Sequence, residues 1–161
     1  MTLILGLILL IYALTIGHLI YGFDQIPTYK KSDGNPETYF AILLPFRNES
    51  ENLPALLESF KNLNYPKNQF EIIFVDDFSG DDSVKLIYNW RMENGKFHTT
   101  LLENLRISNS PKKDAITRAI PIIKNEWIIT TDADCVVPEN WLLTIDNYIQ
   151  SYDVAMIVGA V

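Results

Sequence analysis

One stretch, Trp127-Ile128-Ile129-Thr130-Thr131-Asp132-Ala133-Asp134-Cys135-Val136-Val137-Pro138, joins a short apolar run to two carboxylates. An apolar run that ends in acidic residues is typical of a buried strand with a site at its carboxyl end. Residues two apart on an extended backbone point to the same side, so we expect Asp132 and Asp134 to direct their oxygens at one point. Carboxylates that close repel each other unless one is protonated or a cation lies between them, and a hard divalent ion is the usual solution. A solvated Asp-rich turn is the alternative, because D-x-D is also common in turns.

The composition limits the possible partners and compartments. The chain has 161 residues, with 13 Lys and Arg against 20 Asp and Glu, which gives a formal net charge of -7. This acidic balance argues against nucleic acid as a partner, because phosphates are met by a basic surface. The single cysteine, Cys135, excludes an internal disulfide and a cysteine-based zinc cluster. We expect Cys135 to be a small buried hydrophobe rather than a reactive thiol.

The amino terminus is typical of a membrane segment. Thr2 through Phe23 contains no charged residue, and about 20 apolar residues in a helix match the thickness of a bilayer's hydrocarbon layer. A cleaved signal peptide would need a basic region and a small-x-small site, and neither is evident. We therefore predict a retained single-pass transmembrane anchor over residues 1–23. Lys30 and Lys31 follow it, which places the rest of the chain in the cytoplasm by the positive-inside tendency.

Residues 24–37 are rich in proline, glycine and mixed charge, and they indicate a linker to a domain over residues 38–161. In that domain short apolar runs alternate with helical periodicity, which predicts an α/β fold with a mostly parallel sheet and flanking helices. The expected strands cover 39–44, 70–75, 97–102, 126–131 and 154–161. The expected helices cover 53–62, a segment that begins near Ser83, 112–124 and 141–149. We expect Pro45 to end the first strand and Pro121 to shorten or kink the third helix.

Polar groups follow three of the predicted strands: Arg47-Asn48-Glu49, Asp76-Asp77 and Asp132-Ala133-Asp134. Ligands of parallel sheets bind beyond the carboxyl ends of the strands, so three polar strand ends at one edge indicate a site. Carboxylates hold a diphosphate only through a metal, and they can also read a base or ribose by hydrogen bonds. A nucleoside diphosphate with a cation therefore fits this edge. Lys112 and Lys113 either add positive charge toward phosphate or form a solvated helix start.

The same residues carry a family resemblance. Four segments occur in the order and spacing of the family 2 glycosyltransferases: Ile42-Leu43-Leu44-Pro45-Phe46-Arg47-Asn48-Glu49, Phe74-Val75-Asp76-Asp77-Phe78-Ser79-Gly80-Asp81-Asp82-Ser83, Lys112-Lys113-Asp114-Ala115 and Asp132-Ala133-Asp134. The chain after the linker thus resembles these enzymes, which have a GT-A (Rossmann-like) fold, use nucleotide sugars and invert the anomeric centre. Two positions depart from the family pattern. Phe78 stands where the family usually has Gly, and Pro111 to Asp114 replaces the usual Gly near the lysine motif.

The resemblance implies roles for individual residues. Contacts with the nucleotide sugar fall to Pro45, Arg47, Glu49, Asp76, Asp77, Lys113 and Asp132. Asp134 is the implied metal ligand, with Asp132 beside it, for Mn²⁺ or Mg²⁺. Asp77 is the implied reader of the base, which points to uracil and a UDP-sugar donor.

The resemblance also implies the reaction and its missing part. A base activates an acceptor hydroxyl, which displaces the diphosphate directly while the metal stabilises the leaving group. In the family that base and a later aromatic-basic motif lie beyond the position of Val161, so no catalytic residue is assigned here. We therefore expect an incomplete domain that binds donor and metal but turns over little alone. The sequence does not identify the acceptor, which is a saccharide or a lipid.

Two other interpretations stay open at this point. Asp132-Ala133-Asp134-Cys135-Val136 also fits the D-x-D-x-[TV] pattern of haloacid-dehalogenase-like phosphatases, in which the first Asp is a nucleophile. That motif normally follows the first strand of its domain, whereas most of this chain precedes it. The second alternative is a non-catalytic truncated remnant, or a membrane-tethered half-domain that needs a partner chain.

Overall fold

A computed structural model describes residues 2–25 and 35–159. The chain separates into two units, which divide between Ser32 and Asp33. Much of the predicted linker, including Lys30 and Lys31, lies outside the described residues. The last part of that linker belongs to the second unit, because the backbone N–H groups of Glu37 and Thr38 donate to the buried carboxylate of Asp146.

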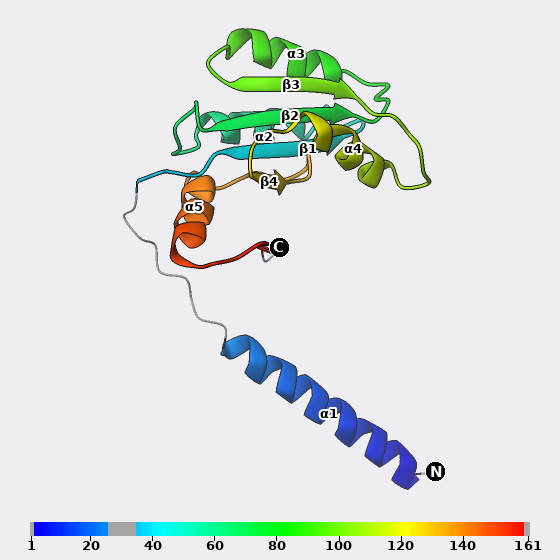
Figure 1. Ribbon diagram of the computed structural model, residues 1–161. Helices are drawn as coiled ribbons and strands as arrows, with labels where there is room; N and C mark the ends of the chain where they lie inside the picture. Colours follow the sequence, from blue (N-terminus) through cyan, green and yellow to red (C-terminus); the bar gives the residue numbers. More distant parts are fainter. Residues whose placement is uncertain (1, 26–34, 160–161) are drawn as a thin grey trace. The chain divides into compact units, whose positions relative to one another are not determined.

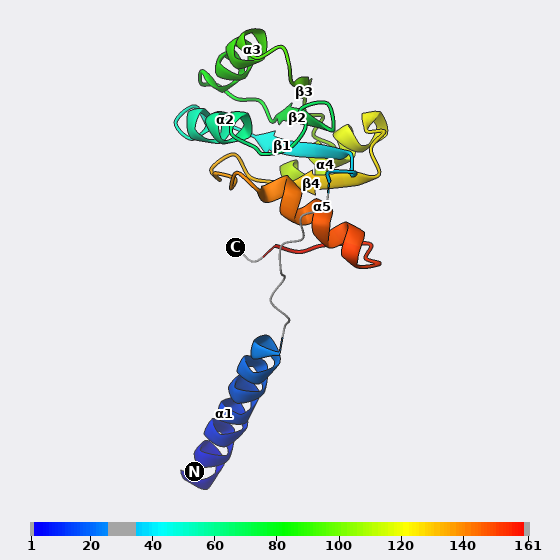
Figure 2. The same ribbon diagram turned by 90° about the vertical axis from the view of Figure 1, so that its left-hand side faces the viewer.

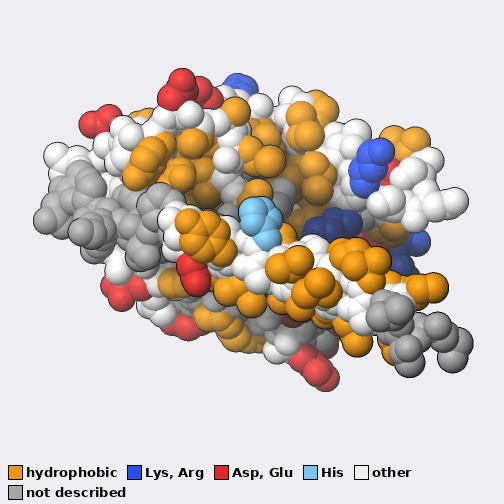
Figure 3. Space-filling view, turned by 90° about the horizontal axis from the view of Figure 1, so that it is seen from below, with side chains coloured by type: hydrophobic (Ala, Val, Ile, Leu, Met, Phe, Trp, Pro, Cys, Tyr) orange, Lys and Arg blue, Asp and Glu red, His pale blue; other side chains and the backbone are white. Residues whose placement is uncertain are grey.

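The first unit is a single helix, α1 (Thr2–Asp24). Its 23 residues give a length of about 35 Å, which is sufficient to cross the hydrocarbon layer of a bilayer. Every described side chain of α1 is exposed, and in Figure 3 hydrophobic side chains cover most of the helix face turned to the viewer. The helix is therefore apolar on all sides rather than amphipathic, as a membrane span would be.

The second unit is built on a parallel sheet. Among the described residues it has four strands: β1 (Phe40–Phe46), β2 (Phe70–Asp76), β3 (His98–Glu103) and β4 (Trp127–Thr130). All neighbours are parallel and the order is β3-β2-β1-β4 (Figure 1). The predicted α/β class with a mostly parallel sheet is confirmed.

The strand order decides where the helices lie. The chain moves outward from β1 to β3 and then returns across the sheet to β4. Because crossovers are right-handed, this reversal puts the connecting helix on the opposite face. Accordingly α2 (Leu53–Lys61) and α3 (Ser83–Glu93) cover one face, and α4 (Pro111–Ala119) covers the other (Figure 2). The last helix, α5 (Trp141–Ser151), adds Leu142 to the core on the α2 side.

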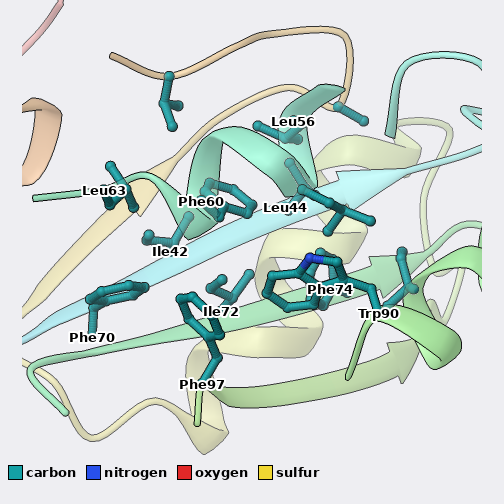
Figure 4. Packing of buried hydrophobic residues seen from close by; sticks show 14 of the residues in the cluster. Ile42, Leu44, Leu56, Phe60, Leu63, Phe70, Ile72, Phe74, Trp90 and Phe97 are labelled. Atoms are coloured by element: carbon teal, nitrogen blue, oxygen red, sulfur yellow. The ribbon is translucent and has the colours of Figure 1, made fainter. Parts of the chain in front are cut away.

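Alternation along the strands builds two cores. Ile42 and Leu44 of β1 face α2 and α3, whereas Ala41 and Leu43 face α4, as the two-residue period of a strand requires. The α2 side is the larger core and is rich in aromatic rings, with Phe60 over β1 and Trp90 against Phe74 (Figure 4). Helix α4 approaches through small residues, which keeps it close to the sheet.

Of the two predictions about proline, the one for Pro45 is wrong and the one for Pro121 is confirmed. Pro45 does not end the first strand, because it lies within β1 opposite Val75 of β2. Leu43, two residues earlier, accepts a hydrogen bond from the Thr131 N–H on the β4 side of β1. The backbone of Pro45 faces the same side, but β4 has ended by that point. Pro45 therefore needs no N–H for the ladder with β4. Pro121 does shorten the third helix: α4 ends at Ala119, and a 3₁₀ turn, η1 (Ile120–Ile122), follows.

Two further predictions are wrong. The strand expected over 154–161 does not form in its described part, 154–159, which pairs with none of the described strands and in which Met156 and Val158 are exposed. An apolar run alone does not make a strand. Cys135 is exposed rather than buried, because it follows the turn that directs the acidic pair outward.

Candidate functional site

A cleft of about 290 Å³ opens at the carboxyl ends of β1, β2 and β4. It lies where the strand order reverses, because β1 is followed in sequence by β2 on one side and paired with β4 on the other. Such switch points are where parallel α/β sheets bind ligands. Its lining residues are Pro45, Phe46, Arg47, Glu49, Asp77, Pro111, Lys112, Ala115, Asp132, Ala133 and Asp134.

A second, larger hollow of about 780 Å³ lies at the opposite end of the sheet. Residues 37–39, 124–127 and 149–154 line it, which are the segments before β1 and β4 and the end of α5. None of the four described strands delivers its carboxyl end to this hollow, so its size does not make it the better candidate. We take the smaller cleft as the site because three strand ends converge there.

The loops after β1 and β2 are joined to each other on the rim of the cleft. The Asn48 N–H donates to Ser79 Oγ at 3.0 Å, and the Gly80 N–H donates to Asn48 Oδ1 at 2.8 Å. Asn48 has a φ of 55°, a left-handed conformation that asparagine tolerates better than most residues. We call the two segments, 46–50 and 77–83, the double loop.

A second set of bonds ties the double loop to the start of α3. The Glu49 N–H donates to the buried Ser83 Oγ at 2.8 Å. The carboxylate of Asp81 accepts from the N–H groups of Ser50 and Ser83, both at 3.0 Å. Hydrogen bonds from Ser83 and Ser50 hold the pKa of Asp81 below its usual range. Glu49 is therefore positioned at the cleft through its backbone N–H, and its carboxylate also accepts from Asn52 Nδ2 at 2.8 Å.

Asp77 is the most tightly held acid of the cleft, and it is 6% exposed. Its Oδ1 accepts from Arg106 Nε at 2.8 Å and from Asn104 Nδ2 at 2.7 Å, and its Oδ2 accepts from Arg106 Nη2. Arg47 Nη1 lies 3.8 Å from Oδ2, on the cleft side. The bond from Arg106 lowers the pKa of Asp77, and burial opposes that effect without overcoming it. Asp77 is thus an anion of the cleft lining that Arg106 and Asn104 hold in place.

The acidic pair after β4 lies in a turn and not on an extended backbone, so the predicted backbone geometry is wrong. The Cys135 N–H donates to the Asp132 carbonyl at 3.3 Å. Ala133 between the two acids is 4% exposed and points into the core, whereas both carboxylates are exposed. The two acids therefore still share the outer side, and both line the cleft. Lys112 Nζ forms an ion pair with Asp132 Oδ1.

These residues fit a divalent cation only in part. Within residues 2–25 and 35–159, no group of three or more His, Cys, Asp or Glu side chains is arranged to hold a metal. Two exposed carboxylates on one rim suit Mg²⁺ or Mn²⁺, which are commonly bound by one or two carboxylates together with substrate phosphates. The Lys112 ammonium at Asp132 shows that this rim already attracts positive charge.

The structure brings most of the predicted site residues together. Those that line the cleft are Pro45, Arg47, Glu49, Asp77, Asp132 and Asp134. Lys112, which the sequence suggested only as added positive charge or a solvated helix start, lines it as well. Two lie elsewhere. Asp76 Oδ1 accepts from the Ser79 N–H at 3.0 Å and so closes the turn after β2. Lys113 is exposed on α4 and is not among the lining residues.

Sequence reasoning missed the loop after β3, which supplies Asn104 and Arg106 to Asp77. This loop is held by Asp114 of α4, whose carboxylate accepts from the N–H groups of Ile107 and Ser108 at 3.0 and 2.8 Å. Bonds from Ser108 lower the pKa of Asp114. The sequence did contain a signal for this loop, because polar residues follow β3 as they follow the other three strands. Ligands of parallel sheets bind beyond the carboxyl ends of the strands, and this applies to β3 as well.

Comparisons with known proteins agree that the chain is similar to glycosyltransferases. The model of the family described as "Glycosyl transferase family 2" matches residues 41–161. A poly-beta-1,6-N-acetyl-D-glucosamine synthase of Staphylococcus epidermidis is 30% identical over 110 residues, which cover 68% of this chain and 25% of that protein. A beta-monoglucosyldiacylglycerol synthase of Trichormus variabilis is 27% identical over 115 residues, with coverage of 71% and 24%. The chain spans about a quarter of the length of these relatives.

Solved structures show the same fold. Staphylococcus aureus TarS in complex with UDP-GlcNAc superposes with a TM-score of 0.63 at 23% identity, over 71% of this chain and 32% of that one. A Pyrobaculum calidifontis mannosyltransferase in complex with GDP-Man and Mn²⁺ has a TM-score of 0.64 at 22% identity, with coverage of 86% and 42%. At this identity the likeness supports the fold alone, which is the GT-A arrangement expected from the sequence. The family match favours a glycosyltransferase over the phosphatase alternative, and Asp132 follows the fourth described strand rather than the first.

Proposed function

Because this chain belongs to glycosyl transferase family 2, we propose that it binds the nucleotide-sugar donor, a UDP-sugar, of a transfer reaction to an acceptor hydroxyl. One observation carries the proposal. The carboxyl ends of β1, β2 and β4 deliver Glu49, Asp77 and Asp134 to a single cleft at the switch point of the sheet. The complexes of the solved relatives with UDP-GlcNAc and GDP-Man support a nucleotide-sugar ligand.

The charged residues of the cleft indicate which part of the nucleotide each end of the cleft binds. The nucleoside lies at the β2 end, where Asp77 and Arg47 can bond to a base or ribose and Glu49 adds an acceptor. The diphosphate lies at the β4 end, where Asp132 and Asp134 hold Mn²⁺ or Mg²⁺ and Lys112 supplies a point charge. The cation, when bound, acts as a Lewis acid that stabilises the departing diphosphate.

The transfer step itself is proposed from the chain's membership of the family. The acceptor hydroxyl, on a saccharide or a lipid, attacks the anomeric carbon with inversion as the bond to the diphosphate breaks. We assign no described side chain of the cleft to deprotonation of that hydroxyl, and a base beyond Val161 stays a prediction. The chain is held at a membrane by α1, with the cleft on the cytoplasmic side.

The test of donor binding is calorimetric titration of UDP into the full chain, in detergent micelles, with and without Mn²⁺. We expect Mn²⁺ to strengthen UDP binding. Asp134→Asn should remove most of this gain, a loss of about tenfold or more in affinity, because a bond to a charged group contributes about 1.5–3 kcal/mol.

The matched control is Asp153→Asn, an equally exposed acid at the second hollow, which should leave UDP binding unchanged. A UDP titration that is the same with and without Mn²⁺ contradicts the metal site. Turnover of a UDP-sugar by this chain alone would contradict the expectation that it carries only the donor part. Donor binding without turnover is also what a partner-dependent half-domain would show.

A further inference from the structure

Phe78 is in a backbone conformation that its side chain disfavours. It directly follows Asp77 at the end of β2 and has a φ of 59°, in the left-handed region. A bulky residue there is an outlier, and glycine is the residue that accepts such a φ freely. Gly80 lies two positions further on, yet none of the described glycines has a positive φ. The strained position therefore carries an aromatic ring although a glycine stands nearby.

The backbone of the double loop imposes this conformation. The Asp77 N–H donates to the Phe46 carbonyl at 2.9 Å, and the Ser79 N–H donates to Asp76 Oδ1 at 3.0 Å. Both neighbours of Phe78 are thus fixed by bonds that do not involve its side chain. Strain of this kind persists where the surroundings over-determine the backbone, and such positions cluster at functional sites.

The fold does not use the ring of Phe78 for its core. The residue is 48% exposed and belongs to neither of the two hydrophobic clusters. The ring packs against the guanidinium of Arg106, whose central carbon lies 5.5 Å from the ring centroid. Arg106 is held in turn by two bonds to the Asp77 carboxylate. An aromatic ring, backed on one side by a fixed guanidinium, is therefore presented next to Asp77.

The position of this ring matches one part of a nucleoside diphosphate. Asp77 follows β2 and the Asp132–Asp134 pair follows β4, two strands away, which separates them by about 10 Å. A diphosphate held at the β4 end leaves the nucleoside to extend toward β2. There it meets Asp77, which lines the cleft. Phe78 follows Asp77 directly and is 48% exposed, so it lies next to the lining residues without being one of them. Aromatic side chains bind bases by stacking, because every base has a π-face.

We propose that Phe78, backed by Arg106, is the stacking surface for the nucleobase of the donor. The inference rests on the proposed function, since it requires a nucleoside diphosphate in the cleft. It assigns the ring to affinity for the base and not for the diphosphate. It also gives a reason for an aromatic residue at a position where the backbone favours glycine.

The test uses the full chain in detergent with Mn²⁺ and compares UDP with inorganic pyrophosphate, which has no base. Phe78→Gly should weaken UDP binding by about fivefold or more, the scale of removing one aromatic stacking partner. It should leave pyrophosphate affinity unchanged and should not lower the unfolding temperature, because glycine relieves the left-handed φ. Loss of a ring that served the fold would instead lower it.

A second pair of variants keeps the backbone strain and separates aromaticity from bulk. Phe78→Leu should lose UDP affinity as Phe78→Gly does, whereas Phe78→Trp should retain it. If the unsubstituted chain binds UDP and Phe78→Gly binds it equally well, the stacking role is overturned and the proposed function stands. The stacking role is also overturned if Phe78→Gly weakens the binding of pyrophosphate and UDP to the same extent. If the unsubstituted chain binds no UDP, the proposed function fails, and the stacking role fails with it.

Discussion

The residues that shape the cleft are mostly held by partners that do not themselves line it. Asp77 has bonds from Arg106 and Asn104, and the loop that carries both is tied down by Asp114. The sequence pattern identified Asp77 because it follows a strong apolar run. It did not identify Arg106 or the function of Asp114, because such contacts depend on loops whose path a local pattern does not specify.

Asp114 provides a test at this scale. It is 6% exposed and accepts bonds from two backbone N–H groups and the Ser108 hydroxyl. Asp114→Asn replaces one acceptor oxygen with a donor, so the free energy of unfolding should fall by about 1–3 kcal/mol in urea titrations. Glu103→Gln, the same kind of change on an exposed side chain, is the control. Equal effects of the two substitutions would contradict the role given to Asp114.

The pH dependence of stability follows from the same acids. The pKa values of Asp77 and Asp114 are both lowered from an ordinary value of 3.8. A carboxylate with a lowered pKa stabilises the folded state above its ordinary pKa, and this contribution is lost as the pH falls through the folded value. The free energy of unfolding should therefore decrease from about pH 5 downward. Asp114→Asn should make that decrease smaller, and an unchanged decrease would count against the assignment.

At the scale of elements, the cleft depends on how strand ends and loops are joined. The strands were predictable because long apolar runs in a buried parallel sheet leave a clear pattern. The double loop was not, since its bonds connect residues about 30 positions apart through short polar side chains. The failed strand at 154–159 shows the other limit. That segment is apolar, yet it pairs with none of the described strands.

Ser83 tests the double loop. Its buried hydroxyl accepts from the Glu49 N–H, so Ser83→Ala should lower the free energy of unfolding by about 1 kcal/mol. Because Glu49 then loses the bond that ties its N–H to α3, UDP affinity should fall as well. Ser151→Ala at the end of α5 removes a hydroxyl far from the cleft and should change neither quantity. A Ser83→Ala chain with full stability and full UDP affinity would show that the double loop does not position Glu49.

At the scale of the whole molecule, the chain combines an apolar helix with an α/β unit. Length and composition alone indicated the helix, and periodicity indicated the α/β class. The order of the strands, and with it the switch point, needed the structure, because a parallel pattern allows several orders. The cleft could be predicted as a meeting of three particular strand ends, but the sequence did not show which of those strands are neighbours.

The membrane role of α1 can be measured by flotation with phospholipid vesicles. We expect the full chain to rise with the vesicles. Leu10→Arg combined with Leu14→Arg should abolish this, because each arginine near the centre of a span costs about 2.5–3.5 kcal/mol on insertion scales. Tyr88→Arg, on an exposed face of α3, should not. Continued flotation of the double variant would contradict a membrane-spanning α1.

The central claim is that a cation bridges the carboxylates after β4 to a nucleoside diphosphate in the cleft. Its most direct test is to locate Mn²⁺ by anomalous scattering in crystals of the full chain grown with UDP and Mn²⁺. We predict one strong peak in coordination contact with Asp134 or Asp132 and with the diphosphate of UDP, and the base at the Asp77 end. A Mn²⁺ peak at the second hollow beside Glu126 or Asp153, or UDP bound outside the cleft, would contradict the account.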